Sequence, residues 1–384
     1  MLPYCSFNAT ESAVDESQET LEEPIVLAKP AFLRHIHYFR AVAILFVVVS
    51  HVILVPCLHT SFQEPVHAVC FLFFTNATVF FVLISGFLFQ HINDNPGFRY
   101  GRLMKKKFLN VYLPMLVMSL PAMLLYFAYA DQVRSLLGAP AVERSVAEEV
   151  LGGLFALVAG LWLGPYWYIP FIMMVFAISP LILRFIRWRY SLGLTLATIP
   201  LGFFFFPRTF DLWPAVIPYF LPLFVLGAIL SYRYDSIQGH IERGLLVYGI
   251  LALACMVVCF LVPHQEPTYA GIFNVSPRAG VHSVVSGWFK VFLAMFFWGL
   301  LIKCEHREFK LLDRIAAYSF GIYFIHSYFL NLGLFHYNNL WPPPGGLSLL
   351  VTLAYCILVP LLSLAIAMLI KRVFRRYARY VAGV

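Results

Sequence analysis

Long apolar runs, separated by short polar or charged segments, recur along the chain from residue 34 to residue 370. An apolar run of about twenty residues is long enough to cross the hydrocarbon core of a bilayer as an α-helix. The pattern predicts about ten such spans. Their expected ranges are residues 38–58, 67–90, 111–130, 166–186, 191–206, 213–231, 244–262, 282–302, 315–335 and 347–370. The sequence therefore predicts an all-α, polytopic membrane protein.

Two further segments stand apart from this series. Residues 150–163 form an apolar run of only about fourteen residues, a length typical of a re-entrant or interfacial helix, and we expect a helix at the outer membrane face. Residues 1–33 are mostly acidic and polar and lack apolar periodicity, which predicts a disordered cytoplasmic tail without a cleavable signal peptide. The transmembrane domain is then expected to cover residues 34–384.

The composition supports this class of protein. Hydrophobic residues make up 61% of the chain, charged residues only 12%, and the mean hydropathy is +0.80. These values exclude an ordinary soluble domain. The formal net charge of +8 is therefore interpreted as a result of membrane topology, and we expect no nucleic-acid partner.

Arginine and lysine residues concentrate in alternate loops. If the N-terminus is cytoplasmic, the cytoplasmic side holds nearly all of them, as the positive-inside rule requires. The cations on the other side are Arg134, Arg144, Arg208 and Arg278. This asymmetry predicts that both termini are cytoplasmic.

The seven cysteines are scattered and include no CxxC pair. Cys255 and Cys259 share a helix face but belong to no recognisable metal-ligand motif, so we expect no metal site. Cys57 and Cys70 fall near the outer ends of neighbouring spans, and a disulfide between them is left open.

The first span carries an arginine and a histidine in an otherwise apolar setting. Arg40 and His51 are eleven residues apart, which at about 100° per residue places them within roughly 20° on one helical stripe, roughly 16 Å apart along the axis. Alone, Arg40 could be a snorkelling anchor and His51 a helix-packing residue. Polar groups inside a membrane usually face a protein interior or a wet cavity, so the pair indicates a functional site.

Two more polar residues are expected at the depth of His51. Lys290 in the eighth span and His326 in the ninth each lie about twelve residues from the cytoplasmic end, or roughly 18 Å at about 1.5 Å per residue. A common depth on three spans predicts one shared cavity, although chance placement would give the same pattern.

The densest basic cluster follows the second span, in the string RYGRLMKKKFLNVYLP of residues 99–114, which we interpret as a cytoplasmic loop. The cluster comprises Arg99, Arg102, Lys105, Lys106 and Lys107. Such cations could bind acidic lipid headgroups or the phosphates of a soluble anionic cofactor. The residue pattern alone leaves both readings open.

An aromatic string opens the fourth span, where GPYWYIPF places Trp167 between two tyrosines. Tryptophan and tyrosine are common at membrane interfaces, so an interfacial belt is one interpretation. The other is a platform on which the apolar face of a sugar ring stacks.

Four strings in the sequence resemble motifs of one protein family. Residues 36–51, IHYFRAVAILFVVVSH, resemble the string LDGLRAIAILLVVLFH with its Arg–x10–His spacing, and residues 79–89, VFFVLISGFLF, resemble FFxLSGFL. Residues 164–183 are similar to LWFLPxLL followed by FPLL, and residues 318–330, YSFGIYFIHSYFL, are similar to SYGIYLxHxP. Over most of residues 34–371 the chain thus resembles the acyltransferase-3 family of integral membrane acyltransferases.

The resemblance implies a membrane O-acyltransferase in the bacterial inner (cytoplasmic) membrane that modifies polysaccharide of the cell envelope, for example by O-acetylation. The donor would be acyl-CoA, acetyl-CoA in the simplest case, with no tightly bound cofactor, and the acceptor a carbohydrate or lipid-linked glycan. The chain would be the membrane module alone, without an appended soluble domain. The family connects its basic segment, close to RRxLRIxPxY, with the donor. Here Asn110 stands where the family usually has arginine, and Pro114 is displaced by one position.

The resemblance and the residues together suggest roles for the site. His51 would be the catalytic group, either as a general base or as a covalent acyl carrier, and Arg40 would steady the donor. Trp167, Lys290 and His326 would line the substrate cavity. The alternative is an exporter of glycans or lipids whose intramembrane His and Lys line a permeation path, and a structural partner with a degenerate site is a third reading.

Overall fold

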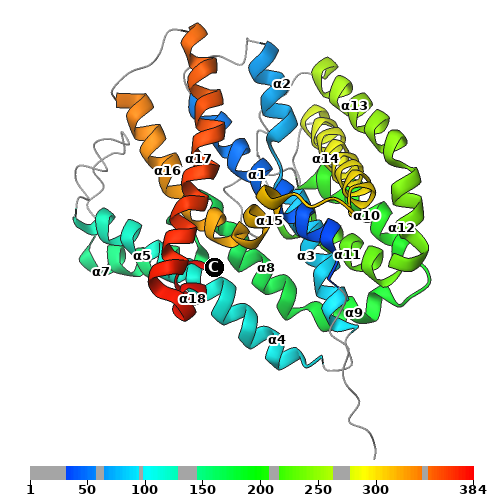
Figure 1. Cartoon of the computed structure of the whole chain (residues 1–384), viewed down its shortest axis with the longest axis horizontal. Coiled ribbons are helices and arrows are strands. Elements are labelled where there is room, and N and C mark those ends of the chain that lie inside the picture. Colours follow the sequence, from blue (N-terminus) through cyan, green and yellow to red (C-terminus); the bar gives the residue numbers. More distant parts are fainter. Residues whose placement is uncertain are drawn as a thin grey trace, which may run out of the picture.

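The computed structural model describes residues 32–57, 65–94, 98–128, 145–206, 216–262, 277–339 and 345–384. Every regular element within these residues is a helix (Figure 1), which confirms the all-α class. The expected tail lies outside the described residues except for its last two, and the side chain of Cys57, one partner of the disulfide left open above, lies outside them as well.

Six helices coincide with expected spans to within a few residues. They are α1 (Arg34–Cys57), α10 (Ser191–Phe205), α11 (Val216–Tyr232), α13 (Leu245–Leu261), α14 (Pro277–Lys303) and α17 (Gly345–Phe374). Apolar length alone specifies these helices, because each lies between polar or proline-containing segments where the apolar run ends.

Five helical segments are long and apolar enough to cross a membrane, and two bent helix pairs raise the number of candidate spans among the described residues to seven. Helices α10 and α13 are apolar but shorter. The chain is therefore an integral membrane protein with five to seven candidate spans by this measure, whereas the sequence pattern predicts about ten.

The second expected span is broken. α2 (Pro65–Phe74) and α3 (Thr78–Asn93) are separated by a turn in which Asn76 has a positive φ of 58°. Asparagine tolerates this left-handed conformation better than most residues. The polar residues Thr75, Asn76 and Thr78 lie at this turn, but the apolar runs on either side together have the length of one span, so the break was not predicted.

The fourth expected span is divided as well, into η2 (Gly164–Trp167), α8 (Tyr168–Ala177) and α9 (Ser179–Ile186). It is preceded by α7 (Val146–Ala159), which is helical as expected and meets the next helical segment at an angle of 68°. Gly160 has a φ of 68°, and a Cβ there would lie 2.7 Å from the carbonyl oxygen of Tyr166. Glycine is thus required for the bend between α7 and η2.

The basic cluster is helical, and its interpretation as a loop is wrong. Its residues belong to or directly precede α4 (Tyr100–Lys107), which continues through the π-helical turn η1 (Phe108–Tyr112) into α5 (Leu113–Ala128). Lysine and arginine are good helix formers, so a run of charge need not end a helix. Pro114 has no N–H to donate to Asn110, which accounts for the irregular turn at this point.

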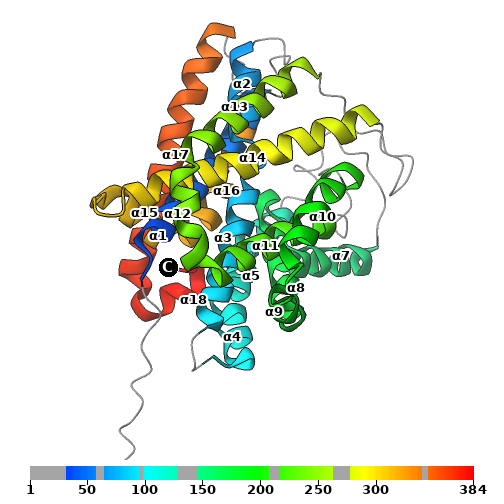
Figure 2. The ribbon, with the colours of Figure 1, turned by 90° about the vertical axis from the view of Figure 1, so that its right-hand side faces the viewer.

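The ninth expected span consists of two helices, α15 (Lys310–Ala317) and α16 (Ser319–Asn339). Three shorter elements were not expected: α12 (Tyr234–Arg243), η4 (Arg375–Tyr377) and α18 (Ala378–Ala382). α12 turns by 105° from α11. Figure 2 shows α4 at one end of the molecule and α2 and the start of α17 at the opposite end.

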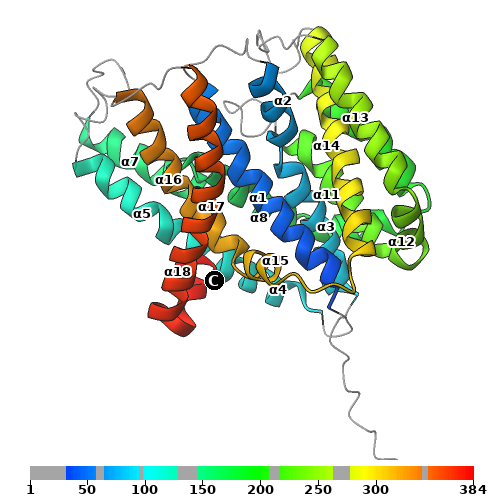
Figure 3. The same cartoon turned by 45° about the horizontal axis from the view of Figure 1, so that its top comes forward.

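Helix α1 lies in the centre of the bundle and contacts α14, α15, α16 and α17 (Figures 1 and 3). Its N-terminal end is tied to the turn after α14, where His35 Nδ1 lies 3.1 Å from Glu305 Oε1 and the Phe309 N–H donates to the Tyr38 hydroxyl over 3.1 Å. These contacts fix the position of α1 along its axis relative to the turn after α14.

Helices α3 and α11 cross almost backbone to backbone. A Cβ at Gly86 would lie 1.9 Å from the carbonyl oxygen of Phe224, and a Cβ at Gly227 would lie 2.0 Å from that of Leu83. Small residues allow such close approach of helices in membranes. Gly86 is thus required at this crossing, and Gly227 is its counterpart on α11.

Candidate functional site

The stripe of α1 that carries Arg40 and His51 faces one side of α16. Arg40 Nη2 donates a hydrogen bond of 2.8 Å to Ser319 Oγ, and His51 Nδ1 lies 3.4 Å from His326 Nε2. Ser319 and His326 are seven residues apart, or about two helical turns, and so share a face of α16. The two helices therefore run in the same direction and meet through polar side chains at two levels.

The imidazole of His326 is completely buried. Its Nδ1 lies 3.1 Å from the carbonyl oxygen of Ile322, one turn earlier in α16. The rings of His51 and His326 have centroids 5.4 Å apart and are inclined by 36°. The two histidines thus form a pair that is anchored to the backbone of α16.

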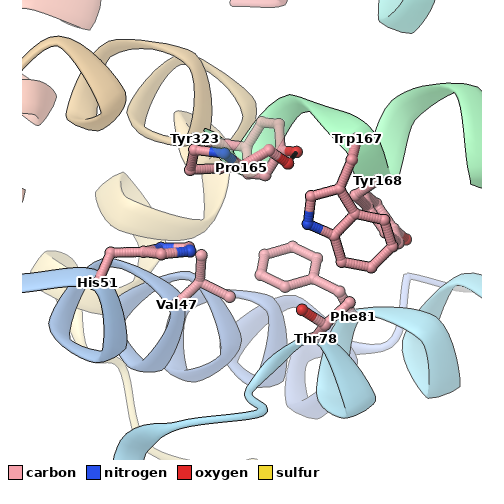
Figure 4. Close-up of a pocket in the computed structure, with 8 residues that line it drawn as sticks. All are labelled: Val47, His51, Thr78, Phe81, Pro165, Trp167, Tyr168 and Tyr323. Carbon is pink, nitrogen blue, oxygen red and sulfur yellow. Dashed lines mark hydrogen bonds between the residues drawn. The ribbon is translucent and has the colours of Figure 1, made fainter. Parts of the chain in front are cut away.

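His51 also lines a pocket with an empty volume of about 300 Å³, counted with its mouth. The other lining residues are Val47, Thr78, Phe81, Pro165, Trp167, Tyr168 and Tyr323. Figure 4 shows the His51 ring on one side of this pocket and the Trp167 indole on the other. The pocket is small and places an imidazole opposite aromatic walls.

Tyrosine hydrogen bonds hold the wall opposite His51 in place. The Tyr166 hydroxyl donates to the carbonyl oxygen of Phe324 over 2.7 Å, and the Tyr323 hydroxyl donates to that of Pro165. Two such bonds in opposite directions fasten the η2 turn to α16. Tyr168, whose hydroxyl is 3.0 Å from Ser85 Oγ, fastens the same wall to α3.

A second group of residues lies at the other end of the Arg40 stripe. The Lys107 ammonium stands 4.5 Å from the centre of the Phe176 ring and lies within electrostatic range of Arg40. Both side chains are only partly exposed. Among the described residues, no carboxylate lies within ion-pair distance of either cation. Two neighbouring cations without an acidic partner form a place where an anion would be stabilised.

The structure therefore separates the members of the basic cluster. Lys107 is half-buried beside Arg40, whereas the side chains of the other four cations, Arg99, Arg102, Lys105 and Lys106, are exposed. This division follows from the helical form of α4, in which only one face of the helix contacts the protein.

Lys290 lies elsewhere in the interior. Its ammonium is buried and donates to the carbonyl oxygens of Leu72, at 3.0 Å, and Phe73, at the end of α2. It is not among the residues that line the pocket with His51. A cation at the C-terminal end of a helix compensates the partial negative charge of carbonyls that have lost their helical partners.

Of the residues expected in the site, His51 and Trp167 line the pocket, and His326 contacts His51 without lining it. Arg40 and Lys107 lie toward the other end of the stripe. Sequence reasoning missed Ser319 and Tyr323, whereas Tyr168 belongs to the aromatic string already considered as a stacking platform. The sequence spacing could have indicated Ser319, because residues seven positions apart share a helix face and His326 was already a candidate. Among the described residues, no three His, Cys, Asp or Glu side chains are grouped as metal ligands would be.

The chain is similar to proteins of Staphylococcus aureus strains MRSA252 and MSSA476 that are each named a probable poly-beta-1,6-N-acetyl-D-glucosamine export protein. Each is 23% identical over 352 residues, which cover 83% of this chain and 89% of the relative. No solved structure matches the chain. The model of the acyltransferase domain matches residues 33–368, and the chain therefore belongs to the acyltransferase-3 family.

Proposed function

We propose that this protein is a membrane-bound O-acyltransferase that moves an acyl group from cytoplasmic acyl-CoA, acetyl-CoA in the simplest case, to a hydroxyl group of an extracytoplasmic glycan or glycolipid. Family membership supports acyl transfer. The names of the relatives, which refer to a polysaccharide, support a glycan as the acceptor.

One observation carries the proposal: a single helical stripe joins a pair of cations to a pocket-lining imidazole. Arg40 lies at one end of the stripe with Lys107 within electrostatic range, and His51 lies about three turns further along α1. An acyl-CoA donor has phosphates at one end and a thioester at the end of an extended arm. Its phosphates would bind Arg40 and Lys107, and its thioester would reach the pocket beside His51.

The chemistry that His51 would supply is proton transfer. As the acceptor oxygen attacks the thioester carbonyl, the imidazole takes the hydroxyl proton, and the carbon–sulfur bond breaks to release the thiolate of coenzyme A. The same proton returns to that thiolate. In a covalent route the imidazole would itself accept the acyl group, and coenzyme A would then leave before the acceptor binds. Release of coenzyme A without acceptor distinguishes the two routes.

The proposed arrangement in the membrane places the basic ends of the helices in the cytoplasm. Figure 3 shows α4, α12, α15 and α18 toward the same end of the molecule as the start of α1, and these helices carry arginine or lysine. The positive-inside rule then puts both termini and the Arg40–Lys107 pair on the cytoplasmic side. We further propose about ten crossings by residues 34–384, with residues 1–33 as a cytoplasmic tail, in a bacterial inner membrane.

The exposed members of the basic cluster have a separate proposed role. Arg99, Arg102, Lys105 and Lys106 point away from the protein, where they would contact acidic lipid headgroups and make a first contact with the donor phosphates. Trp167, opposite His51, would pack against the acceptor sugar or the acyl group.

Export of a glycan is the second candidate function, because the relatives are named export proteins. In that case His51 and His326 would line a path for the polymer, and no acyl donor would be consumed. Proteoliposomes loaded with a fluorescent oligosaccharide would release it when they contain an exporter, with or without acyl-CoA.

The test of the proposed function is direct. Purified protein in lipid nanodiscs is incubated with acetyl-CoA that carries a radiolabelled acetyl group and with oligomers of β-1,6-linked N-acetylglucosamine or other envelope glycans. We expect label in the glycan and release of coenzyme A. Glycan movement in proteoliposomes without label transfer would instead establish the exporter.

A further inference from the structure

The contact between His326 and the backbone of α16 determines where its proton is. A carbonyl oxygen only accepts hydrogen bonds, so the Nδ1 atom of His326 that lies 3.1 Å from the Ile322 oxygen must carry a hydrogen. A flip of the ring would place a carbon atom against that oxygen and leave a buried N–H without this acceptor, which is costly.

The proton on one ring nitrogen then specifies the state of the other. In a neutral imidazole with hydrogen on Nδ1, the Nε2 atom is an acceptor. His326 Nε2 faces His51 Nδ1 at 3.4 Å, so His51 must be the donor in this contact. His51 therefore carries its hydrogen on Nδ1, and its Nε2 is unprotonated.

We propose that His326 is a positioning residue that holds His51 in the tautomer with an unprotonated Nε2 directed to the pocket. Two hydrogen bonds connect these groups, one between His326 Nδ1 and the Ile322 carbonyl oxygen and one between His326 Nε2 and His51 Nδ1. Figure 4 shows the His51 ring projecting from α1 to the pocket wall. As a consequence for catalysis, which rests on the proposed function, His51 would be ready to take a proton from a hydroxyl. The hydrogen bond that one imidazole nitrogen makes generally sets the state of the other.

The surroundings of His326 suit this role better than direct chemistry. Its side chain is completely buried, and it is not among the residues that line the pocket. Its ring packs 5.9 Å from that of Tyr323, whose hydroxyl donates to the Pro165 carbonyl. The ring is thus held between α1 and the η2 turn, in contact with the reactive imidazole and away from the substrate.

Two substitutions separate positioning from other roles. His326→Gln retains an amide N–H for the Ile322 carbonyl and an amide oxygen to accept from His51, whereas His326→Leu retains neither. We expect His326→Leu to lower kcat roughly 10- to 100-fold, the usual cost of removing a group that orients a functional imidazole. The KM for acetyl-CoA should not change, and His326→Gln should recover most of the loss.

The matched control is His240→Gln. His240 on α12 makes the same contact with a carbonyl one turn earlier, at 3.0 Å from Ser236, but it is exposed and remote from the pocket. The His240→Gln variant should have the same kcat and the same KM for acetyl-CoA as the unchanged protein. Normal turnover by His326→Leu, or equal losses in the Gln and Leu variants, would overturn the proposal.

A spectroscopic measurement tests the tautomer without any assay of transfer. In protein labelled with ¹⁵N-histidine in nanodiscs, the His51 signals are assigned by comparison with His51→Gln. We expect a protonated Nδ1 and an unprotonated Nε2 in the unchanged protein and a mixture of tautomers in His326→Leu. A protonated Nε2 on His51 in the unchanged protein would contradict the inference. If no glycan is ever acylated, the proposed function fails, but this measurement still decides the tautomer.

Discussion

Arg40 donates a 2.8 Å hydrogen bond to Ser319, the first residue of α16. This bond holds the guanidinium at the level where α16 begins, two helical turns before the His326 that contacts His51. The packing of α1 against α16 therefore positions both the Arg40 guanidinium and the His51 imidazole. A change in the crossing of α1 and α16 would displace both groups together.

Removal of the His51 imidazole should abolish transfer without loss of the fold. His51→Gln keeps a polar side chain of similar reach but has no titratable base. Loss of general-base catalysis typically lowers a rate by about 10² to 10⁴. We expect normal insertion, normal donor binding and little or no label in the glycan. Near-normal transfer by this variant would rule out His51 as the catalytic group.

The division of the basic cluster predicts unequal effects of equivalent substitutions. Lys107→Gln should raise the KM for acetyl-CoA about 10- to 100-fold, because a charge-assisted contact with a phosphate contributes about 1.5–3 kcal/mol. Lys106→Gln is the matched control, since Lys106 is its exposed neighbour and should change the KM far less. The measurement is initial rate against donor concentration at two salt concentrations, because an exposed charge is screened more strongly. Equal effects of the two substitutions would mean that the half-buried position of Lys107 has no role in donor binding.

Lys290 is expected to stabilise the broken second span. Lys290→Met leaves the carbonyls of Leu72 and Phe73 without their donor, at a cost of about 1–3 kcal/mol for buried groups. The thermal midpoint in detergent should fall, while the KM for the donor should stay the same. Lys303→Met, at the exposed end of the same helix, is the control. Unchanged stability with a large loss of kcat would instead place Lys290 in the reaction.

The crossing of α3 and α11 should not tolerate a side chain at either glycine. Gly86→Val or Gly227→Val places a Cβ about 2 Å from a backbone oxygen of the other helix, and overpacking typically costs about 1–3 kcal/mol or more. We expect a lower midpoint and less folded protein in the membrane. Gly193→Val in α10 is the control, because nothing lies within 4 Å of a Cβ there. If the thermal midpoint falls equally in all three variants, the cause is the introduction of valine into a helix and not the close contact between α3 and α11.

The proposed topology predicts the outcome of reporter fusions. Fusions after Asp94, Arg187 and Arg376 should report a cytoplasmic location, and fusions near Ala141 and Tyr269 an extracytoplasmic one. An extracytoplasmic signal at Arg187 would mean that residues 150–163, most of which lie in α7, cross the membrane as a span of their own, separate from α8. The number of crossings would then differ from the proposal.

The sequence by itself determined most of the long apolar helices and which residues of a helix share a stripe. Apolar length and the 3.6-residue period are local properties, so α1, α14 and α17 were predicted to within a few residues, and Arg40 and His51 were placed on one face of α1. The motifs at residues 36–51, 79–89, 164–183 and 318–330 also indicated the family before any helix was placed in space.

Only the tertiary structure decided what each polar group contacts, because that depends on which helix lies opposite. His326 contacts His51, whereas Lys290, expected at the same depth, contacts the end of α2. The break at Asn76 that exposes those carbonyls was not predicted, because a few polar residues inside an apolar run of span length do not by themselves end a helix. Likewise, five cations of one cluster are equivalent by composition, and only the packing of α4 against the protein directs Lys107 to Arg40.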